Sequence, residues 1–166
     1  MGRKINPGAF RLGVIKDWDS KWFSKKNLGL FLEEDHIIRK HIGKKLKNAG
    51  VEKIIIERNA NNINVIIRTS KPGIIIGRGG AGAEEITTEL KRLIKKPIRL
   101  EIQELKNPDT YAVLVAQSVA SQIEKRMPFR RVLKQTLDRV MGNKEISGAK
   151  SQVAGRLGGA DMSRRE

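Results

Sequence analysis

The stretch Gly77-Arg78-Gly79-Gly80 has the residue types that a phosphate-binding loop requires. Glycines let the backbone approach a phosphodiester chain without a side-chain clash, and Arg78 supplies a cation. The helix that we expect after the loop adds unpaired amides and a positive dipole end. A tight turn before a helix would use the same residues, and a G-x-x-G pattern on its own favours that second interpretation. The order of the surrounding elements decides between the two.

A second group of cations, Arg130, Arg131 and Lys134, falls on one face of a helix that is predicted to begin at Pro128. At about 100° per residue, these side chains lie together with Asp138, opposite the apolar stripe of that helix. Such a face is usually solvated surface. Here Lys134 and Asp138 form the only i, i+4 ion pair that the face allows. The sequence therefore predicts mostly unneutralised cations on a rigid helix, as binding of phosphates requires.

Residue sets for catalysis or cofactor binding are missing from the sequence. The Gly77 stretch lacks the Gly-Lys-Ser/Thr of a nucleoside-triphosphate loop, and the dinucleotide pattern G-x-G-x-x-G is not matched. His36 and His41 are five residues apart, so they do not share a helix face, and no carboxylate cluster accompanies them. Without cysteine, the chain has no thiolate nucleophile, disulfide or sulfur-based zinc site. We therefore expect a protein that is not an enzyme and has no cofactor, metal or small-molecule substrate.

Positive charge is distributed along all 166 residues. The 34 Lys and Arg outnumber the 18 Asp and Glu, for a net charge of +16, with +7 in residues 1–50, +4 in 51–106 and +5 in 107–166. A polyanion is the expected partner. Because 39% of the residues are hydrophobic, the chain is predicted to fold. Its longest apolar run, Ala112 to Ala116, is too short to span a membrane, and no membrane partner is expected.

The first 31 residues contain five of the seven aromatic residues, mixed with basic side chains and without a helical or strand period. Those aromatic residues are Phe10, Trp18, Trp22, Phe23 and Phe31. Cations that meet phosphates and rings that stack on bases suit a segment that orders against nucleic acid. The same rings could instead pack onto the domain as an N-terminal strap, and the two roles are compatible.

The segments around the glycine-rich loop alternate between helical and strand periodicity. Glu33, Glu34 and Asp35 are placed to open a helix, and Gly50 is placed to end it. In chain order, the predicted elements are a helix (33–49), two strands (51–58 and 63–68) joined by a turn (59–62), the loop, a helix (83–96) and a strand (98–104).

Asn107-Pro108 is predicted to separate this region from a second one. Asp109 is placed to cap a helix over 112–123 by accepting hydrogen bonds from its free amides. Pro128 is expected at the first position of the next helix, where proline is best tolerated. The stretch 147–154 is predicted as a strand, although its apolar content is low.

Several separated motifs occur in order along essentially the whole chain. They are Gly2-Arg3-Lys4-Ile5-Asn6-Pro7, Arg11-Leu12-Gly13, Trp18-Asp19-Ser20-Lys21-Trp22-Phe23, Ile55-Ile56-Glu57-Arg58, Pro72-Gly73-Ile74-Ile75-Ile76-Gly77, Phe129-Arg130-Arg131 and Gly155-Arg156-Leu157-Gly158-Gly159-Ala160. In these motifs the chain resembles the bacterial family of small-subunit ribosomal protein number three. Their number and order make a chance match implausible.

The resemblance implies an α+β fold, in which a type II KH domain (helix-strand-strand-GxxG-helix-strand) is followed by a second α/β domain. It implies a basic, aromatic N-terminal extension at 1–32, the KH domain at 33–106 and the C-terminal domain at 107–166. It also implies a cytoplasmic location on the head of the small ribosomal subunit, near the place where messenger RNA enters. The implied partners are small-subunit rRNA, mRNA and neighbouring head proteins.

By motif match, the resemblance assigns roles to individual residues. Arg130, Arg131 and Lys134 are expected to hold incoming message and to help unwind it. The KH loop falls on Gly77, Arg78, Gly79 and Gly80. The other expected RNA contacts are Arg3, Lys4, Arg11, Arg156, Arg164 and Arg165.

Three features depart from the family pattern. Gly79 stands where the family commonly has a second basic residue, which leaves Arg78 to act alone. Gly82 is expected to cost about 1 kcal/mol relative to alanine if it lies inside the helix. Family members continue well beyond the Arg-Leu-Gly-Gly-Ala stretch, so the second domain is expected to be incomplete. Either the sequence is a fragment or the missing strands have been lost.

A free-standing KH protein that regulates or processes RNA is the alternative function. A processing enzyme would need a compact carboxylate or histidine cluster, which the sequence lacks. A free regulatory factor would sediment as a monomer, apart from ribosomes. The first expectation is a non-enzymatic component of the small ribosomal subunit.

Overall fold

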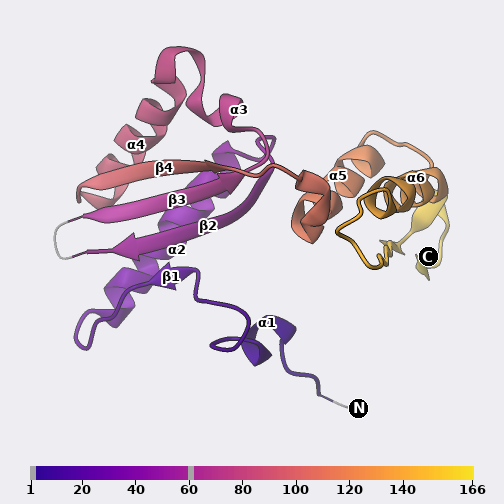
Figure 1. Ribbon diagram of the computed structural model, residues 1–166, viewed down its shortest axis with the longest axis horizontal. Coiled ribbons are helices and arrows are strands. Elements are labelled where there is room, and N and C mark those ends of the chain that lie inside the picture. Colours follow the sequence, from indigo (N-terminus) through magenta and orange to yellow (C-terminus); the bar gives the residue numbers. More distant parts are fainter. Residues whose placement is uncertain (1–2, 60–61) are drawn as a thin grey trace. The chain divides into compact units, whose positions relative to one another are not determined.

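A four-stranded sheet lies at the centre of the first of two units in the computed structural model, which describes residues 3–59 and 62–166. The units are Met1–Glu104 and Leu105–Glu166. The first contains α1 (Pro7–Phe10), β1 (Ser20–Lys21), α2 (Leu28–Lys45), β2 (Val51–Arg58), β3 (Ile63–Thr69), α3 (Pro72–Ile76), a 3-10 turn (Arg78–Gly80), α4 (Ala81–Ile94) and β4 (Ile98–Glu104) (Figure 1).

The strands of the first unit lie side by side in the order β1-β2-β3-β4. Strands β2 and β3 form an antiparallel hairpin, in which Ile56 is opposite Val65. Strand β4 runs parallel to β3, and α4 makes the crossover between them. Strand β1 is parallel to β2, so the N-terminal segment adds an edge to the sheet. The predicted order of helix, two strands, loop, helix and strand is confirmed.

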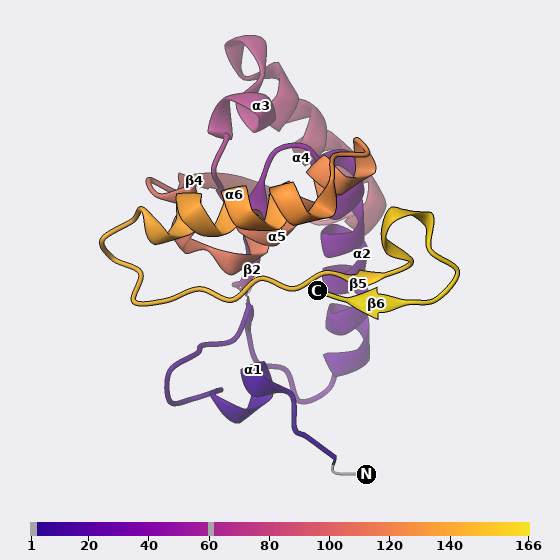
Figure 2. The same cartoon turned by 90° about the vertical axis from the view of Figure 1, so that its right-hand side faces the viewer.

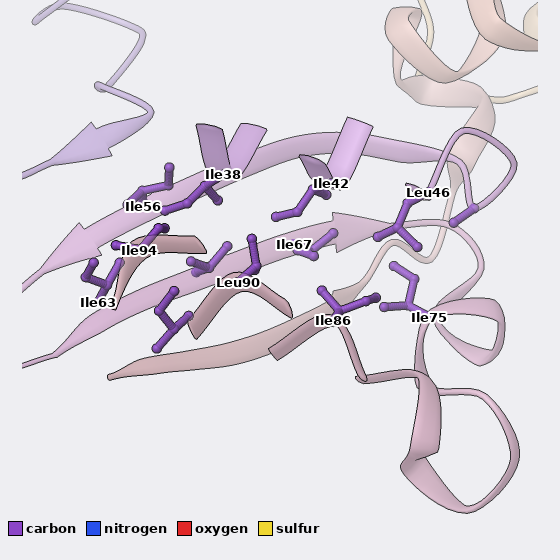
Figure 3. Packing of buried hydrophobic residues seen from close by; sticks show 13 residues of the cluster. Ile38, Ile42, Leu46, Ile56, Ile63, Ile67, Ile75, Ile86, Leu90 and Ile94 are labelled. Atoms are coloured by element: carbon purple, nitrogen blue, oxygen red, sulfur yellow. The ribbon is translucent and has the colours of Figure 1, made fainter. Parts of the chain in front are cut away.

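Helices α2 and α4 bury their apolar stripes against one face of the sheet (Figure 3). Strand β3 contributes Ile63, Val65 and Ile67, which share that face because side chains alternate along a strand. Each large aliphatic side chain that is removed from water contributes about 1.5–3 kcal/mol. The cluster consists of Ile38, Ile42, Leu46, Ala49, Ile56, Ile63, Val65, Ile67, Ile75, Ile86, Leu90, Ile94 and Ile98.

Helix α2 begins five residues before the predicted start at Glu33 and ends at Lys45 rather than Ala49. The predicted role of the acids at the helix start is therefore wrong, because they lie inside the helix. The predicted turn at 59–62 includes Ala60 and Asn61, which are outside the described residues, as is Gly2 of the first motif.

The buried carboxylate of Asp35, one of the three acids inside α2, fastens the N-terminal segment to the sheet. Asp35, which is 4% exposed, accepts hydrogen bonds from Ser20 Oγ and Trp22 Nε1, both at 2.8 Å. Arg58 of β2 donates to the same carboxylate through Nε at 3.0 Å and also through Nη2. The guanidinium of Arg58 also lies 4.8 Å from the ring centroid of Phe31. The strap interpretation of this segment is thus confirmed for Trp22 and Phe31.

The second unit contains two helices and a short hairpin of two antiparallel strands with two residues each (Figure 2). Its elements are a 3-10 turn (Pro108–Thr110), α5 (Ala112–Glu124), α6 (Phe129–Met141), β5 (Ala154–Gly155), a 3-10 turn (Leu157–Gly159) and β6 (Arg164–Arg165). After α6, an irregular segment returns along both helices to β5 and leaves an open, mostly apolar cavity of about 740 Å³.

Three predictions for the second unit are wrong. The stretch 147–154 is irregular as far as Gln152, because it has few apolar residues, and it pairs with a strand at its end alone, where Val153 lies opposite Glu166 and Ala154 opposite Arg165. Asp109 does not cap α5, since it lies in the 3-10 turn and pairs with Arg139 Nε at 3.0 Å. Pro128 precedes the first helical residue of α6, with an extended ψ of 118°.

Candidate nucleic-acid interface

The glycine-rich loop connects α3 to α4 at a turn that projects away from the sheet (Figure 1). Gly77, Gly79 and Gly80 all have positive φ angles, of 69°, 62° and 89°. At Gly79 the ψ of 16° completes a left-handed conformation, which glycine adopts more readily than a residue with a side chain. Arg78 is exposed and is the cation of the loop.

Gly82, in the first turn of α4, sets the distance between α3 and α4. A Cβ at this position would lie 2.7 Å from the carbonyl oxygen of Ile75 and 3.2 Å from that of Ile76. Ile75 is fully buried in the core, so it has little room to move. The expectation that alanine would be better here by about 1 kcal/mol is therefore wrong, because this clash outweighs the gain in helix propensity.

Charged contacts between α2 and α4 hold the helix that follows the loop. Lys45 Nζ lies 2.8 Å from Glu89 and 2.9 Å from Glu85, and His41 Nε2 lies 2.8 Å from Glu89. Hydrogen bonds from Lys45 and His41 hold the pKa of Glu89 below its ordinary value. His41 thus has a structural contact. Within the described ranges, no three His, Asp or Glu side chains are grouped to hold a metal ion.

The loop can bind an anion through its backbone. Helix α4 has 14 residues; the amide of its first residue, Ala81, donates to the carbonyl oxygen of Arg78, and the amides that follow in the first turn have no partner inside the helix. The glycines keep side chains away from those amides, while the exposed Arg78 adds a positive charge beside them. This arrangement suits a phosphate of a single strand; it offers no group poised for proton transfer.

Helix α6 presents its cations opposite the buried face formed by Val132, Leu133, Thr136 and Val140. Arg131 and Lys134 are exposed. In the part of the chain that the structure covers, no ion pair joins Lys134 to Asp138. Arg131 and Lys134 therefore carry uncompensated charge.

Arg130 differs from the other two cations. Its Nε donates to Glu166 Oε2 at 3.0 Å and its Nη2 to Glu166 Oε1 at 2.8 Å. The prediction of mostly unneutralised cations is therefore wrong for Arg130. Glu166 was not predicted as a partner of Arg130, although an acid at the end of the basic stretch Ser163-Arg164-Arg165-Glu166 was a signal.

The remaining candidates lie at the two ends of the chain. Arg3 and Lys4 are exposed and precede α1, and Arg11 donates to the carbonyl oxygen of Pro7 at 3.0 Å. Arg156 donates to the carbonyl oxygen of Ala160 and lies 3.3 Å from Asp161. Arg164 and Arg165 form the exposed strand β6.

The N-terminal aromatic residues divide into two groups. Trp22 and Phe31 pack edge to face with their ring centroids 5.3 Å apart. Phe10, Trp18 and Phe23 are 71%, 62% and 83% exposed. Because these three rings are exposed among basic residues, they are available to stack on bases, as the predicted role in nucleic-acid binding requires.

The helices packed on one sheet face and the exposed glycine-rich loop are features of KH-domain proteins. Residues 37–110 match the KH domain family. Residues 119–166 match the family described as "Ribosomal protein S3, C-terminal domain". The chain belongs to the bacterial family of small ribosomal subunit protein uS3. Because members of this family are structural proteins without enzymatic activity, the expectation that the chain is not an enzyme is confirmed.

Three relatives illustrate the similarity, which covers 100% of this chain in each case. Small ribosomal subunit protein uS3 of Exiguobacterium sibiricum is 47% identical over 167 residues, which are 76% of its length. The uS3 proteins of Lachnoclostridium phytofermentans and Lactobacillus helveticus are 49% and 51% identical over 166 residues, 75% and 74% of their lengths. None of the helices in the described part of the chain has the length and apolar character needed to cross a bilayer.

Proposed function

We propose that this chain binds rRNA in the head of the small ribosomal subunit and holds messenger RNA where it enters. The observation that carries this proposal is the exposure of Arg131 and Lys134 on a rigid helix, without a carboxylate partner among the described residues. Cations fixed in this way can meet phosphates without first losing an intramolecular ion pair.

Each of the three expected parts of the chain makes its own RNA contacts. Residues 1–32 and the C-terminal arginines, Arg156, Arg164 and Arg165, contact rRNA. The loop Gly77–Gly80 in the KH domain, 33–106, contacts a short single strand through its amides and Arg78. In the remaining domain, 107–166, the exposed face of α6 contacts incoming message and helps to unwind it. Neighbouring head proteins complete the set of partners.

Sedimentation of the tagged chain through a sucrose gradient tests this assignment. We expect the protein to migrate with small ribosomal subunits and to remain there after washing at moderate salt. The physical reason is that many phosphate contacts on several elements release slowly as a set. Recovery of the chain at the top of the gradient as a monomer would instead support a free-standing KH factor.

A further inference from the structure

The Arg130–Glu166 ion pair has the geometry with which an arginine holds a phosphate. Two parallel hydrogen bonds, of 3.0 Å from Nε and 2.8 Å from Nη2, join the guanidinium to the two carboxylate oxygens. An arginine fork binds two phosphate oxygens in the same bidentate way. The Glu166 carboxylate therefore occupies the position on Arg130 that a phosphodiester would take.

The backbone determines where Glu166 lies. Its amide donates to the carbonyl oxygen of Val153 at 2.9 Å, and the amide of Val153 donates back at 2.7 Å. These two bonds extend the β5–β6 ladder by one residue pair. The hairpin therefore delivers the Glu166 side chain to the first turn of α6. Hydrogen bonds from Arg130 also hold the pKa of Glu166 below its ordinary value, so the carboxylate is ionised at neutral pH.

Basic residues surround this single acid. One open hollow of about 390 Å³ is lined by Phe129, Leu157 and Arg164, together with the ion pair itself. Another of about 560 Å³ is lined by Arg131 and Lys134, and it also borders the pair. Both hollows are open to solvent next to Arg130, whose side chain is 69% exposed. A polyanionic strand thus has space and positive charge on two sides of Glu166.

We infer that Glu166 is an intramolecular competitor for the phosphate site on Arg130, which RNA gains only by displacing the carboxylate. This inference rests on the proposed function of the α6 face. An exposed ion pair is weak and is screened by salt, so displacement reduces affinity only a few-fold. Arg131 and Lys134 then supply the contacts that do not depend on displacement, whereas the contribution of Arg130 is masked. The expected occupant is an RNA phosphodiester, because cations flank the site on both sides.

A double-mutant cycle with the full chain tests the inference, with a fluorescein-labelled oligouridine as the probe. Glu166→Gln keeps the side-chain size and the backbone bonds but removes the charge. We expect it to tighten binding about two- to fivefold and to steepen the slope of log affinity against log salt by about 0.7. Arg130→Ala should change affinity less than about twofold in the native chain, but should abolish the gain in the Glu166→Gln background.

Asp109→Asn is the matched control for the change in net charge. It frees Arg139, which lies on α6 nine residues after Arg130, from its ion pair with Asp109 of the 3-10 turn. At about 100° per residue, Arg139 lies on the opposite side of α6. We expect the control to leave the salt slope unchanged and to alter affinity less than Glu166→Gln does.

Glu166→Asp, which keeps the charge but withdraws the carboxylate by one methylene, should give a smaller gain in the same direction even if Glu166→Gln perturbs the hairpin.

The outcomes separate this inference from the proposed function. Equal effects of Glu166→Gln and Asp109→Asn, or an equal loss from Arg130→Ala in both backgrounds, would overturn the role of Glu166. An unchanged affinity when Arg131 and Lys134 are replaced would instead overturn the proposed use of the α6 face. A gain from Glu166→Gln that vanishes with Arg130→Ala supports both.

Discussion

Replacing Arg131 and Lys134 together with alanine is expected to weaken binding of single-stranded RNA about tenfold at about 0.15 M salt. Each lost phosphate contact removes the release of about 0.7 counterion, which at this salt corresponds to a factor of about three to four. Both side chains are exposed on a helix whose opposite face is buried, so alanine should leave the fold intact. Fluorescence anisotropy with a labelled oligonucleotide measures the change, and circular dichroism checks the fold.

Lys144→Ala with Lys150→Ala is the charge-matched control for this variant. Both lysines are exposed in the irregular segment after α6, where no helix fixes their direction. We expect the control to lose clearly less affinity than the α6 variant. Equal losses would mean that only net charge matters, which would contradict a specific phosphate track on α6.

The same face should matter for messages that contain secondary structure. With Arg130→Ala added, the triple variant in reconstituted small subunits should slow translation through hairpins more than it reduces subunit assembly. The reason is that the three cations face the message in the proposed arrangement, while rRNA contacts lie elsewhere. Translation of hairpin-containing messages at the native speed would contradict this role.

Asp35→Ala is expected to destabilise the first unit by about 3–5 kcal/mol, because it leaves the buried charge of Arg58 without its main partner. The side chains of Asp35 and Arg58 are each 5% exposed, so water cannot replace the lost contact. Both tryptophans of the chain, Trp18 and Trp22, lie in this unit. Urea unfolding followed by tryptophan fluorescence therefore reports the stability of this unit.

Asp19→Asn is the control for this second variant. Asp19 also forms an ion pair, with Lys53 at 2.6 Å, but its side chain is 51% exposed. We expect it to contribute less than about 1 kcal/mol. If Asp35→Ala costs no more than Asp19→Asn, the buried carboxylate does not fasten the N-terminal segment. Asp35→Leu combined with Arg58→Met should recover much of the loss, since it removes both charges at once.

The carboxylate of Glu34 shows how burial and pairing compete in the same cluster. Burial raises its pKa, but hydrogen bonds from Lys96 and Arg58 together outweigh that effect, so the pKa of Glu34 lies below its ordinary value. A group with a depressed pKa stabilises the fold above its ordinary pKa, and that stability is lost as the pH falls through the folded value. Glu34 thus adds to the stability of this unit at neutral pH.

The periodic parts of the fold were predictable because their pattern is local. Alternating residues such as Ile63, Val65 and Ile67 specify a strand with one buried face, and β3 follows them. The start of α2 was not predictable in this way. Glu34 and Asp35 resemble residues that open a helix, but they bind Arg58, which is far away in sequence. Tertiary contact therefore overrides the local signal.

In the candidate interface, too, the features that depend on local sequence were predictable and those that depend on distant residues were not. The glycine-rich loop was predictable because a single stretch of sequence contains it. The state of Arg130 was not, since its partner Glu166 is 36 residues away and reaches it only through the β5–β6 hairpin. Gly82 was misjudged for a similar reason, because helix propensity says nothing about the carbonyl oxygen of Ile75.

The salt dependence of RNA affinity for the full chain tests the central claim that cations on both units bind RNA phosphates. Each phosphate contact with a single strand contributes a slope of about −0.7 in log affinity against log salt. Four or more contacts predict a slope of about −3 or steeper between about 50 and 200 mM salt. A slope near zero would show that binding does not depend on these cations and would contradict the account.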